Sequence, residues 1–347
     1  MPTLADVAKV AGVGVMSVSR VVNGTRKVSK RTEDKVLAAI RRIGYEPNEA
    51  AKILKGQRAR VFGLIVPDIA DPFFATCANA VQLSAREAGY ITWMVSSNHQ
   101  AAIERQQAEM MMQKQIAGLI VVPMIPDTDY FLKAQSSGLP VIALDRPLAQ
   151  ADADAVTVDN REASVRLVEH LLGHGHRNIL CVTDEQRIIT RQERLTGYTQ
   201  AMQRAKLSTR VCTVGSSHGS FADQFSSIFT TDPKPTAIFA LGDLLTVEVL
   251  RHLQDAHVKI PEEVALVSFD DFDAATLVSP KITVVRQPVA ELGHRAVSLL
   301  LERIDGRSAG PAVHSVLKTE LIIRESCGCG LKHRGSKPKP ARTRASK

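Results

Sequence analysis

The stretch TLADVAKVAGVGVMSVSRVVNG, residues 3–24, determines how the amino-terminal part of the chain folds. Thr3 and Asp6 have the spacing of a capping box, in which each side chain accepts a hydrogen bond from the other residue's backbone amide at a helix start. The apolar residues of this segment recur at helical spacing: Leu4, Val7, Ala8 and Ala11. The pattern predicts a short helix with one apolar face, which ends at Gly12.

A second helix is predicted over residues 15–23, directly after the turn GVG at residues 12–14. Two short helices joined by a tight glycine-containing turn are typical of the helix-turn-helix motif. At about 100° per residue, the residues that face the core are Val18, Val21 and Val22. The residues at the exposed first turn and on the outward face are Val15, Met16, Arg20 and Asn23. The alternative is a small helical bundle of another kind.

The outward residues of the second helix are suited to reading DNA bases. In this motif the second helix lies in the major groove and presents its amino-terminal residues to the base edges. Arg20 can donate two hydrogen bonds to a guanine. Val15 and Met16 lack a strong hydrogen-bonding group and suit contacts with thymine methyl groups or steric exclusion of other bases. We therefore predict that this helix recognises duplex DNA by sequence.

Two further helices are predicted before the first linker. The third helix begins after Ser29 and ends at Gly44. Pro47 prevents it from continuing, and Asn48 is suited to cap a short helix over residues 49–55. This segment is too short to be stable alone, so we expect it to fold against a partner. Its apolar contact points are Ala51 and Leu54.

The distribution of charge favours a polyanionic partner. The chain carries a formal net charge of +8, which divides into +8 for residues 1–60, −7 for residues 61–330 and +7 for residues 331–347. Basic ends on an acidic body are typical of a protein whose ends contact nucleic acid. Residues 331–347 lack core-forming side chains and are expected to be disordered. Their charges either strengthen non-specific DNA affinity or are simply solvated.

The composition excludes several classes of protein. A chain of 347 residues with 44% hydrophobic and 23% charged residues is typical of a globular protein with two or three domains. No apolar run approaches the roughly 20 residues that span a bilayer, and no signal-peptide pattern is visible, so we expect a cytoplasmic protein. The motifs GxSxG, HExxH, the P-loop and a GxGxxG after a strand are all absent, so no enzymatic activity is predicted.

The cysteines and histidines predict neither a metal site nor a cofactor. The five cysteines, at positions 77, 181, 212, 327 and 329, are odd in number and irregular in spacing. Cys327 and Cys329 form a single C-x-C, and no second pair or nearby histidine cluster completes a four-ligand zinc set. We expect buried or free thiols instead. His174 and His176 are expected to lie in a turn between a helix and a strand.

The segment from residue 61 onward alternates between apolar runs and helical patterns. Strands are predicted at residues 61–66, 91–95, 118–122, 141–144, 179–182, 211–214, 237–240 and 264–269. Amphipathic segments such as residues 74–88 and 103–115 separate them. This alternation predicts two series of parallel strands covered by helices on both faces, and hence two similar lobes with a crevice between them.

Polar residues follow the ends of these predicted strands. They are Asp68, Asp71, Asp145, Arg146, Asp243, Asp270 and Asp271. Ligands of open α/β sheets bind at the carboxyl ends of the strands. Carboxylates and an arginine that face one crevice suit a hydroxyl-rich ligand, with Phe73 or Phe74 stacked on its apolar side. The alternative for any single carboxylate is a loop cap or a surface ion pair.

The first 54 residues resemble the DNA-binding head of the lactose/galactose repressor family. The matching pattern is TLxDVA…AGVxxx[ST]VSRVxNG…VS…T…KV…AI…GYxPN…AxxL, which extends from Thr3 to Leu54. The resemblance implies that paired hinge helices enter the minor groove, with Leu54 wedged between base pairs. It places Ala51 and Lys55 beside Leu54, and Tyr45 and Asn48 near phosphates. The DNA-contacting set is completed by Thr3, Val15, Met16, Ser17, Arg20 and Asn23.

The remainder of the chain resembles the effector domain of the same family, which has the fold of periplasmic sugar-binding proteins. The resemblance implies that Arg194 grips the ligand and that Asp270 is a ligand-binding acid. Asp145 and Arg146 match a strand-end pair of sugar-binding members. Gly242 is a departure, because many members have an asparagine before the residue that corresponds to Asp243. The predicted effector set is Phe73, Phe74, Asp145, Arg146, Arg194, Asp243 and Asp270.

The predicted fold class is an all-α helix-turn-helix head followed by an α/β body of two doubly wound parallel-sheet lobes, similar to periplasmic binding proteins. The predicted domains are the head at residues 1–46, the hinge helix and linker at 47–60, the effector-binding and dimerisation body at 61–330, and the basic tail at 331–347. Because the lobes of this fold exchange strands, residues 282–285 and 316–323 are expected to mark return crossings.

The predicted function is that of a transcriptional regulator, a repressor that binds a palindromic operator under allosteric control by a small molecule. The tail has no leucine heptads, so a homodimer is expected rather than a tetramer. The effector is expected to be a sugar or a sugar acid, and the location the nucleoid. A transport protein would need an export signal and no basic head. An architectural nucleoid protein would bind no ligand.

Overall fold

The computed structural model describes residues 2–23, 28–45, 58–124, 129–148, 153–184, 188–214, 221–230, 232–307 and 310–330. The predicted hinge helix and the basic tail at residues 331–347 lie outside the described residues. So do four of the predicted DNA contacts: Asn48, Ala51, Leu54 and Lys55. Of Asn23, the backbone alone is described. The chain divides into two compact units, Met1–Ala59 and Arg60–Lys347, which we call the head and the body.

Among the described residues, the head contains three helices: α1 (Leu4–Ala11), α2 (Val15–Asn23) and α3 (Lys30–Ile43). The predicted capping box is present, because Thr3 and Asp6 each accept a hydrogen bond from the other's backbone amide. Gly12 and Gly44 adopt left-handed conformations at the ends of α1 and α3. The helices enclose a small core of Val7, Ala8, Ala11, Val18, Val36, Ala39 and Tyr45.

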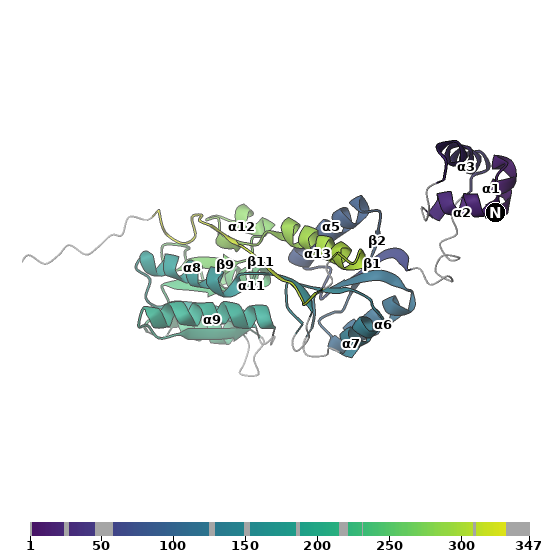
Figure 1. The fold of residues 1–347 in the computed structure, drawn as a ribbon. Coiled ribbons are helices and arrows are strands. Elements are labelled where there is room, and N and C mark those ends of the chain that lie inside the picture. Colours follow the sequence, from purple (N-terminus) through teal and green to yellow (C-terminus); the bar gives the residue numbers. More distant parts are fainter. Residues whose placement is uncertain are drawn as a thin grey trace, which may run out of the picture. The chain divides into compact units, whose positions relative to one another are not determined.

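The body consists of two α/β lobes, shown in Figure 1. The first lobe contains β1 (Ala59–Val66), α5 (Pro72–Glu87), β2 (Ile91–Ser96), α6 (Ala101–Gln113), β3 (Ile116–Val121), α7 (Asp129–Ser136), β4 (Val141–Leu144), β5 (Asp154–Val158), α13 (Val289–Ile304) and β11 (His314–Leu317). Its sheet has the order β11-β5-β4-β3-β1-β2. The core residues show that α5 and α13 cover one face of this sheet, and α6 and α7 the other.

The second lobe repeats this arrangement. It contains α8 (Asn160–Gly173), β6 (Ile179–Asp184), α9 (Ile189–Arg204), β7 (Arg210–Val214), α10 (Phe221–Thr230), β8 (Ala237–Ala240), α11 (Asp243–Asp255), β9 (Ala265–Phe269), α12 (Asp273–Leu277), β10 (Thr283–Arg286) and β12 (Glu320–Ile322). Its sheet has the order β12-β10-β9-β8-β6-β7, in which β12 is antiparallel to β10. Helices α8 and α9 cover one face, and α10, α11 and α12 the other.

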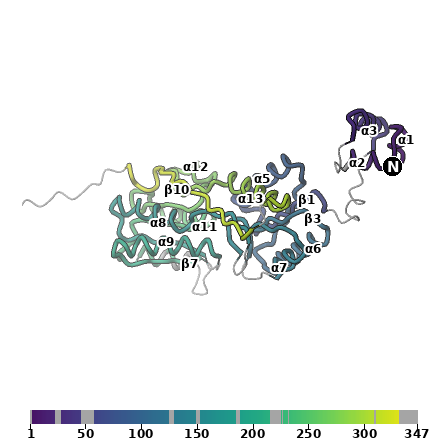
Figure 2. Tube along the Cα trace, in the orientation of Figure 1, coloured from purple at the N-terminus to yellow at the C-terminus, as the bar shows by residue number. Residues whose placement is uncertain are grey.

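In the described part of the body, the chain passes between the lobes three times, as the colours of Figure 2 allow the reader to follow. The passages lie between β5 and α8, between β10 and α13, and between β11 and β12. Asp159 joins the first passage to the third, because its Oδ1 accepts hydrogen bonds of 2.9 Å from both the backbone amide and the hydroxyl of Thr319. Arg166 donates to Asp159 as well, over 3.0 Å. These bonds hold the first and third passages together. We call the three passages the hinge.

The predicted fold class is confirmed, and one strand was missed. Residues 316–323 contain the lobe crossing between β11 and β12, and residues 282–285 lie at β10, directly before the crossing to α13, as expected. The strand β5 was not predicted, although its burial is nearly complete. No helix among the described residues is long and apolar enough to cross a membrane.

Candidate functional site

A pocket of about 320 Å³ lies between the two lobes, at the carboxyl ends of the strands. Its acidic lining residues are Asp71, Asp145, Asp184, Asp243, Glu248 and Asp270, and its arginines are Arg146, Arg191 and Arg194. Phe73 and Phe74 supply the apolar surface, and the Arg146 guanidinium lies over the ring of Phe74 at 5.8 Å. All seven predicted effector residues therefore line one pocket, although their contact with an effector remains a prediction.

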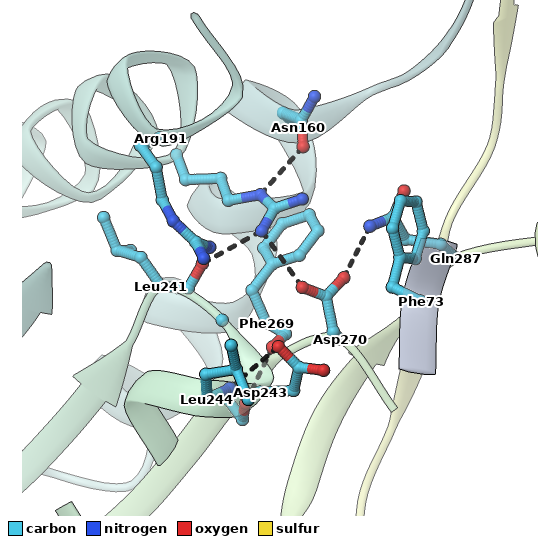
Figure 3. Close-up of polar contacts among 12 residues, drawn as sticks. Phe73, Asn160, Arg191, Leu241, Asp243, Leu244, Phe269, Asp270 and Gln287 are labelled. Carbon is cyan, nitrogen blue, oxygen red and sulfur yellow. Dashed lines mark hydrogen bonds and ion pairs between the residues drawn. The ribbon is translucent and has the colours of Figure 1, made fainter. Parts of the chain in front are cut away.

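Arg194 occupies the centre of the polar network in this pocket. It projects from α9, its residue is 3% exposed, and its guanidinium lies 3.7 Å from the centre of the Phe269 ring. Its Nε donates to Asn160 Oδ1 at 2.9 Å, and its Nη1 donates to Asp270 Oδ2 at 3.2 Å. Figure 3 shows Asn160, Phe269 and Asp270 of this network. A buried arginine needs such partners, because the removal of its charge from water is costly.

Asp270 connects the arginine to the passage between β10 and α13. It follows β9 directly in a left-handed conformation, with φ of 76°, which turns its carboxylate towards the pocket wall. One carboxylate oxygen accepts from Arg194 and the other from the amide nitrogen of Gln287. Because Gln287 precedes α13 of the first lobe, this chain of hydrogen bonds links the pocket to the hinge. A shift of Asp270 would therefore move Gln287, which lies at a lobe crossing.

Arg191 fills the space that Gly242 leaves. A Cβ added to Gly242 would lie 2.3 Å from Arg191 Nη1, and this nitrogen donates to the carbonyl of Leu241. The φ of Gly242 is 179°, an extended conformation open to any residue, so the glycine is needed for space and not for backbone freedom. Many family members have an asparagine amide at the position of Gly242. In this chain the guanidinium of Arg191 therefore takes the place of that amide. Arg191 was missed by the sequence interpretation, since only its packing against Gly242 reveals it.

Several buried oxygens of the pocket have no hydrogen-bond partner among the described residues. They are Asp145 Oδ1, Asp184 Oδ1 and Gln287 Oε1. One buried nitrogen of the pocket, Arg191 Nε, also has no hydrogen-bond partner among the described residues. A buried acceptor without a donor is costly, so a ligand that supplies hydrogen-bond donors would be favoured here. Hydroxyl groups are such donors.

The electrostatics of the pocket also limit the ligand. Burial, together with the negative charges of Asp270 and Asp71, raises the pKa of Asp243 to about 6. Burial likewise raises the pKa of Asp145. Six carboxyl groups face three guanidinium groups in this lining. The excess of acids favours a neutral or cationic ligand over an anionic one.

The predicted DNA-contacting residues of the head have varied exposure. Met16 and Val15 are 69% and 48% exposed on α2, which is unusual for apolar side chains and leaves them accessible to a groove. Ser17 and Arg20 on the same helix are half-buried. Tyr45 is 8% exposed and packs in the head core, so most of its ring stabilises the fold. The hydroxyl of Thr3 donates to Asp6 within the capping box.

Two family models match the chain. Residues 3–48 match the model described as bacterial regulatory proteins, lacI family, and residues 168–327 match a periplasmic binding protein-like domain. Among curated proteins, the HTH-type transcriptional repressor PurR of Haemophilus influenzae is 30% identical over 334 residues, which cover 94% of this chain and 98% of the relative.

Solved structures show the same architecture. The transcriptional regulator CelR in complex with cellobiose is 28% identical with a TM-score of 0.69, and the match covers 94% of this chain and 100% of that one. The lac repressor dimer bound to operator and the anti-inducer ONPF shares the fold with a TM-score of 0.80 at 23% identity, over 94% of this chain and 99% of that one.

Proposed function

The chain belongs to the lacI family of bacterial regulatory proteins, and we propose that it represses transcription by binding a palindromic operator as a homodimer. The observation that carries this proposal is the combination of a helix-turn-helix head, whose α2 exposes Val15 and Met16, with a polar pocket between two hinged lobes. A palindrome requires a twofold symmetric reader, which a dimer supplies. Members of this family are transcription regulators and not enzymes.

The experiment that tests the DNA-binding proposal is a genome-wide map of the sites that the full chain occupies, followed by footprinting of purified protein at physiological salt. We expect protection of a short site with twofold symmetry, because each head reads one half-site. Uniform binding without sequence preference, in the presence and absence of sugars, would contradict the proposal and favour an architectural DNA-binding protein.

We further propose that the effector is a neutral, hydroxyl-rich molecule of the sugar class. The buried acceptors of Asp145, Asp184 and Gln287 favour a ligand with several donors, and the excess of carboxyl groups disfavours a sugar acid. CelR, a structural relative, was solved with cellobiose. Calorimetric titration of the full chain with matched pairs of sugars and sugar acids tests this. Tighter binding of the acid within a pair would contradict it.

The mechanism that we propose is a change of the angle between the lobes. The ligand bonds to residues of both lobes, so its binding alters the hinge at Asp159 and Gln287. The hinge then repositions the segment at residues 47–60, in which Leu54 is predicted to enter the minor groove. An effector can shift this equilibrium only as far as its affinities for the two lobe arrangements differ.

Effector affinity should depend on pH around 6. An ionised Asp243 accepts a hydroxyl hydrogen bond more strongly than a neutral carboxyl, and its pKa is about 6. We expect sugar affinity to fall as the pH is lowered through 6, and Asp243→Asn to bind weakly without this pH dependence. Calorimetric titrations of both proteins on either side of pH 6 check this. An identical pH profile for the two proteins would remove Asp243 from the contact.

The same carboxyl should lower the stability of the body at neutral pH. Its pKa is raised in the folded state, so its contribution to stability is present below about pH 4 and is lost as the pH rises towards 6. Asp243→Asn keeps an acceptor for the amide of Leu244. We expect this variant to raise the free energy of unfolding at pH 7 by about 1–3 kcal/mol. Denaturant titration at pH 4 and pH 7 provides the measurement.

Gly242→Ala should weaken sugar binding and leave the fold intact. Its Cβ would displace the Arg191 guanidinium, which is the flexible end of a long side chain, and the extended backbone accepts alanine. We expect about a tenfold loss of sugar affinity, because a charged hydrogen-bond donor leaves its place. Gly310→Ala is the matched control, since nothing lies within 4 Å of its added Cβ. Equal affinities for both variants would exclude Arg191 from the contact.

A further inference from the structure

Two histidines and two cysteines come together where the carboxyl-terminal segment of the body passes the end of α8. Cys329 Sγ lies 3.0 Å from His170 Nε2 and 2.7 Å from Cys327 Sγ. The possible ligand atoms of His170, His174 and Cys329 all lie within 4.8 Å of one another. The sequence interpretation found no partner for the C-x-C, because 159 residues separate Cys329 from His170.

The two histidines are presented by one helix face. His170 lies in the last turn of α8, and His174 is the residue that caps its carboxyl end. Residues four apart on a helix point the same way, which is the arrangement of the two zinc-binding histidines in an HExxH helix. Their rings lie 4.7 Å apart between centres, and both residues are half-buried, so solvent reaches the cluster.

The two cysteines are held by a turn that is fastened to the sheet. The Ser326 hydroxyl donates to the carbonyl of Leu266 and accepts from the amide of Thr283, and the Ser326 carbonyl accepts from the amide of Leu266. Gly328 has a φ of 76°, a conformation that a glycine adopts without strain and that turns the chain between the two thiols. The pair is thus positioned independently of the tail that follows.

We propose that His170, His174, Cys327 and Cys329 bind one Zn²⁺ ion. Two thiolates and two imidazoles are a preferred zinc set, with a tetrahedral arrangement. Ligand lengths of about 2.0–2.3 Å require ligand atoms roughly 3.3–3.8 Å apart. His170, His174 and Cys329 already lie within 4.8 Å of one another, whereas the thiol of Cys327, which contacts the carbonyl of Arg324 at 3.4 Å, has to turn away from it to complete the set. Binding releases two thiol protons to solvent, and the two thiolates then balance the charge of the ion.

Four protein ligands leave no open position, so this zinc site is structural rather than catalytic. It attaches residues 326–330 to the carboxyl end of α8. The first residue of the same helix, Asn160, accepts the hydrogen bond from Arg194 in the pocket. At 1.5 Å per residue, the separation of ten positions from Asn160 to His170 places the two sites at opposite ends of one helix, about 15 Å apart. The metal would therefore hold α8 in place, and Asn160 of this helix orients Arg194.

Metal analysis of the full chain, purified in the presence of a reductant and without chelator, tests this proposal. We expect one zinc ion per chain and its release when the thiols are modified. Replacement by Co²⁺ should give the visible absorption of a tetrahedral thiolate site. Removal of the metal should lower the melting temperature by about 5 °C or more, and added Zn²⁺ should restore it.

Cys329→Ser and His170→Gln should each lose the zinc and the response of the melting temperature to Zn²⁺. His176→Ala is the matched control, because His176 lies in the following turn, contacts Thr236 and is outside the cluster, so this variant should retain the metal. Circular dichroism and a cooperative melting transition confirm that the body of each variant is folded. The proposal would be overturned if the purified protein held no zinc and its melting temperature did not change on addition of Zn²⁺. A Cys327–Cys329 disulfide in the reduced preparation would also overturn it.

Discussion

Arg194→Ala should abolish the response of operator binding to the effector. The guanidinium makes hydrogen bonds to Asn160, Asp270 and the Leu241 carbonyl in a fully buried position. Loss of a charged hydrogen-bond donor to the ligand costs about 1.5–3 kcal/mol, which corresponds to roughly a 10- to 150-fold loss of sugar affinity. Without the sugar, the affinity for operator should remain near that of the unmodified chain, since the head is untouched. Operator titrations at increasing sugar concentration provide the measurement.

A second arginine on the same helix separates this effect from general damage to α9. Arg204 lies near the carboxyl end of α9, with its side chain 64% exposed beside Glu169. Arg204→Ala removes the same charge, and we expect the effector response to persist because exposed ion pairs contribute little. Arg194→Met should behave like Arg194→Ala, since it keeps apolar volume over Phe269 but no donor. A full sugar response in either Arg194 variant would place the ligand elsewhere.

Much of this pocket could be predicted from the sequence. Apolar runs identify the strands, and the carboxyl ends of parallel strands meet at one edge, so Asp145, Asp243 and Asp270 were expected to lie together. Arg194 was expected only through family resemblance, because nothing in its local helix distinguishes it from its neighbours. Once the strand ends were located, the placement of the carboxylates followed from topology, whereas that of Arg194 did not.

Other members of the site depend on packing that no local pattern records. Arg191 enters because Gly242 lacks a side chain, and Gln287 because the passage from β10 to α13 runs past Asp270. The same is true of the histidine and cysteine cluster, whose members meet only when the carboxyl-terminal segment is laid along α8. Such contacts join residues far apart in the chain, and a single sequence gives no measure of their proximity.

Residues of the head show what helical periodicity can predict and where such a prediction ends. Helical periodicity correctly identified Val18 as buried and left Met16 on the outward face. Periodicity could not place Tyr45, which follows α3 and is part of the core of the head. A phosphate contact by Tyr45 therefore remains a prediction for its hydroxyl alone, since the ring is enclosed.

Arg20→Ala should relax the choice of operator sequence. Arg20 lies on α2 with Met16, one turn further along the helix, and its guanidinium is the only group among the predicted base readers Val15, Met16 and Arg20 that can donate two hydrogen bonds to a guanine. Loss of such a contact costs about 1–3 kcal/mol for the specific site, or roughly a 5- to 150-fold loss of affinity. Affinity for random DNA should change much less.

Loss of positive charge alone should affect DNA binding differently from loss of a base contact. Arg41→Ala measures the effect of charge alone. Arg41 is exposed in the last turn of α3, so its removal subtracts the same charge from the head without touching α2. A phosphate contact contributes equally to specific and random DNA, and its loss reduces the salt dependence of both. Arg20→Ala should therefore lower the ratio of specific to random affinity, whereas Arg41→Ala should leave that ratio unchanged. Identical ratios for the two variants would show that Arg20 contributes charge and does not read a base.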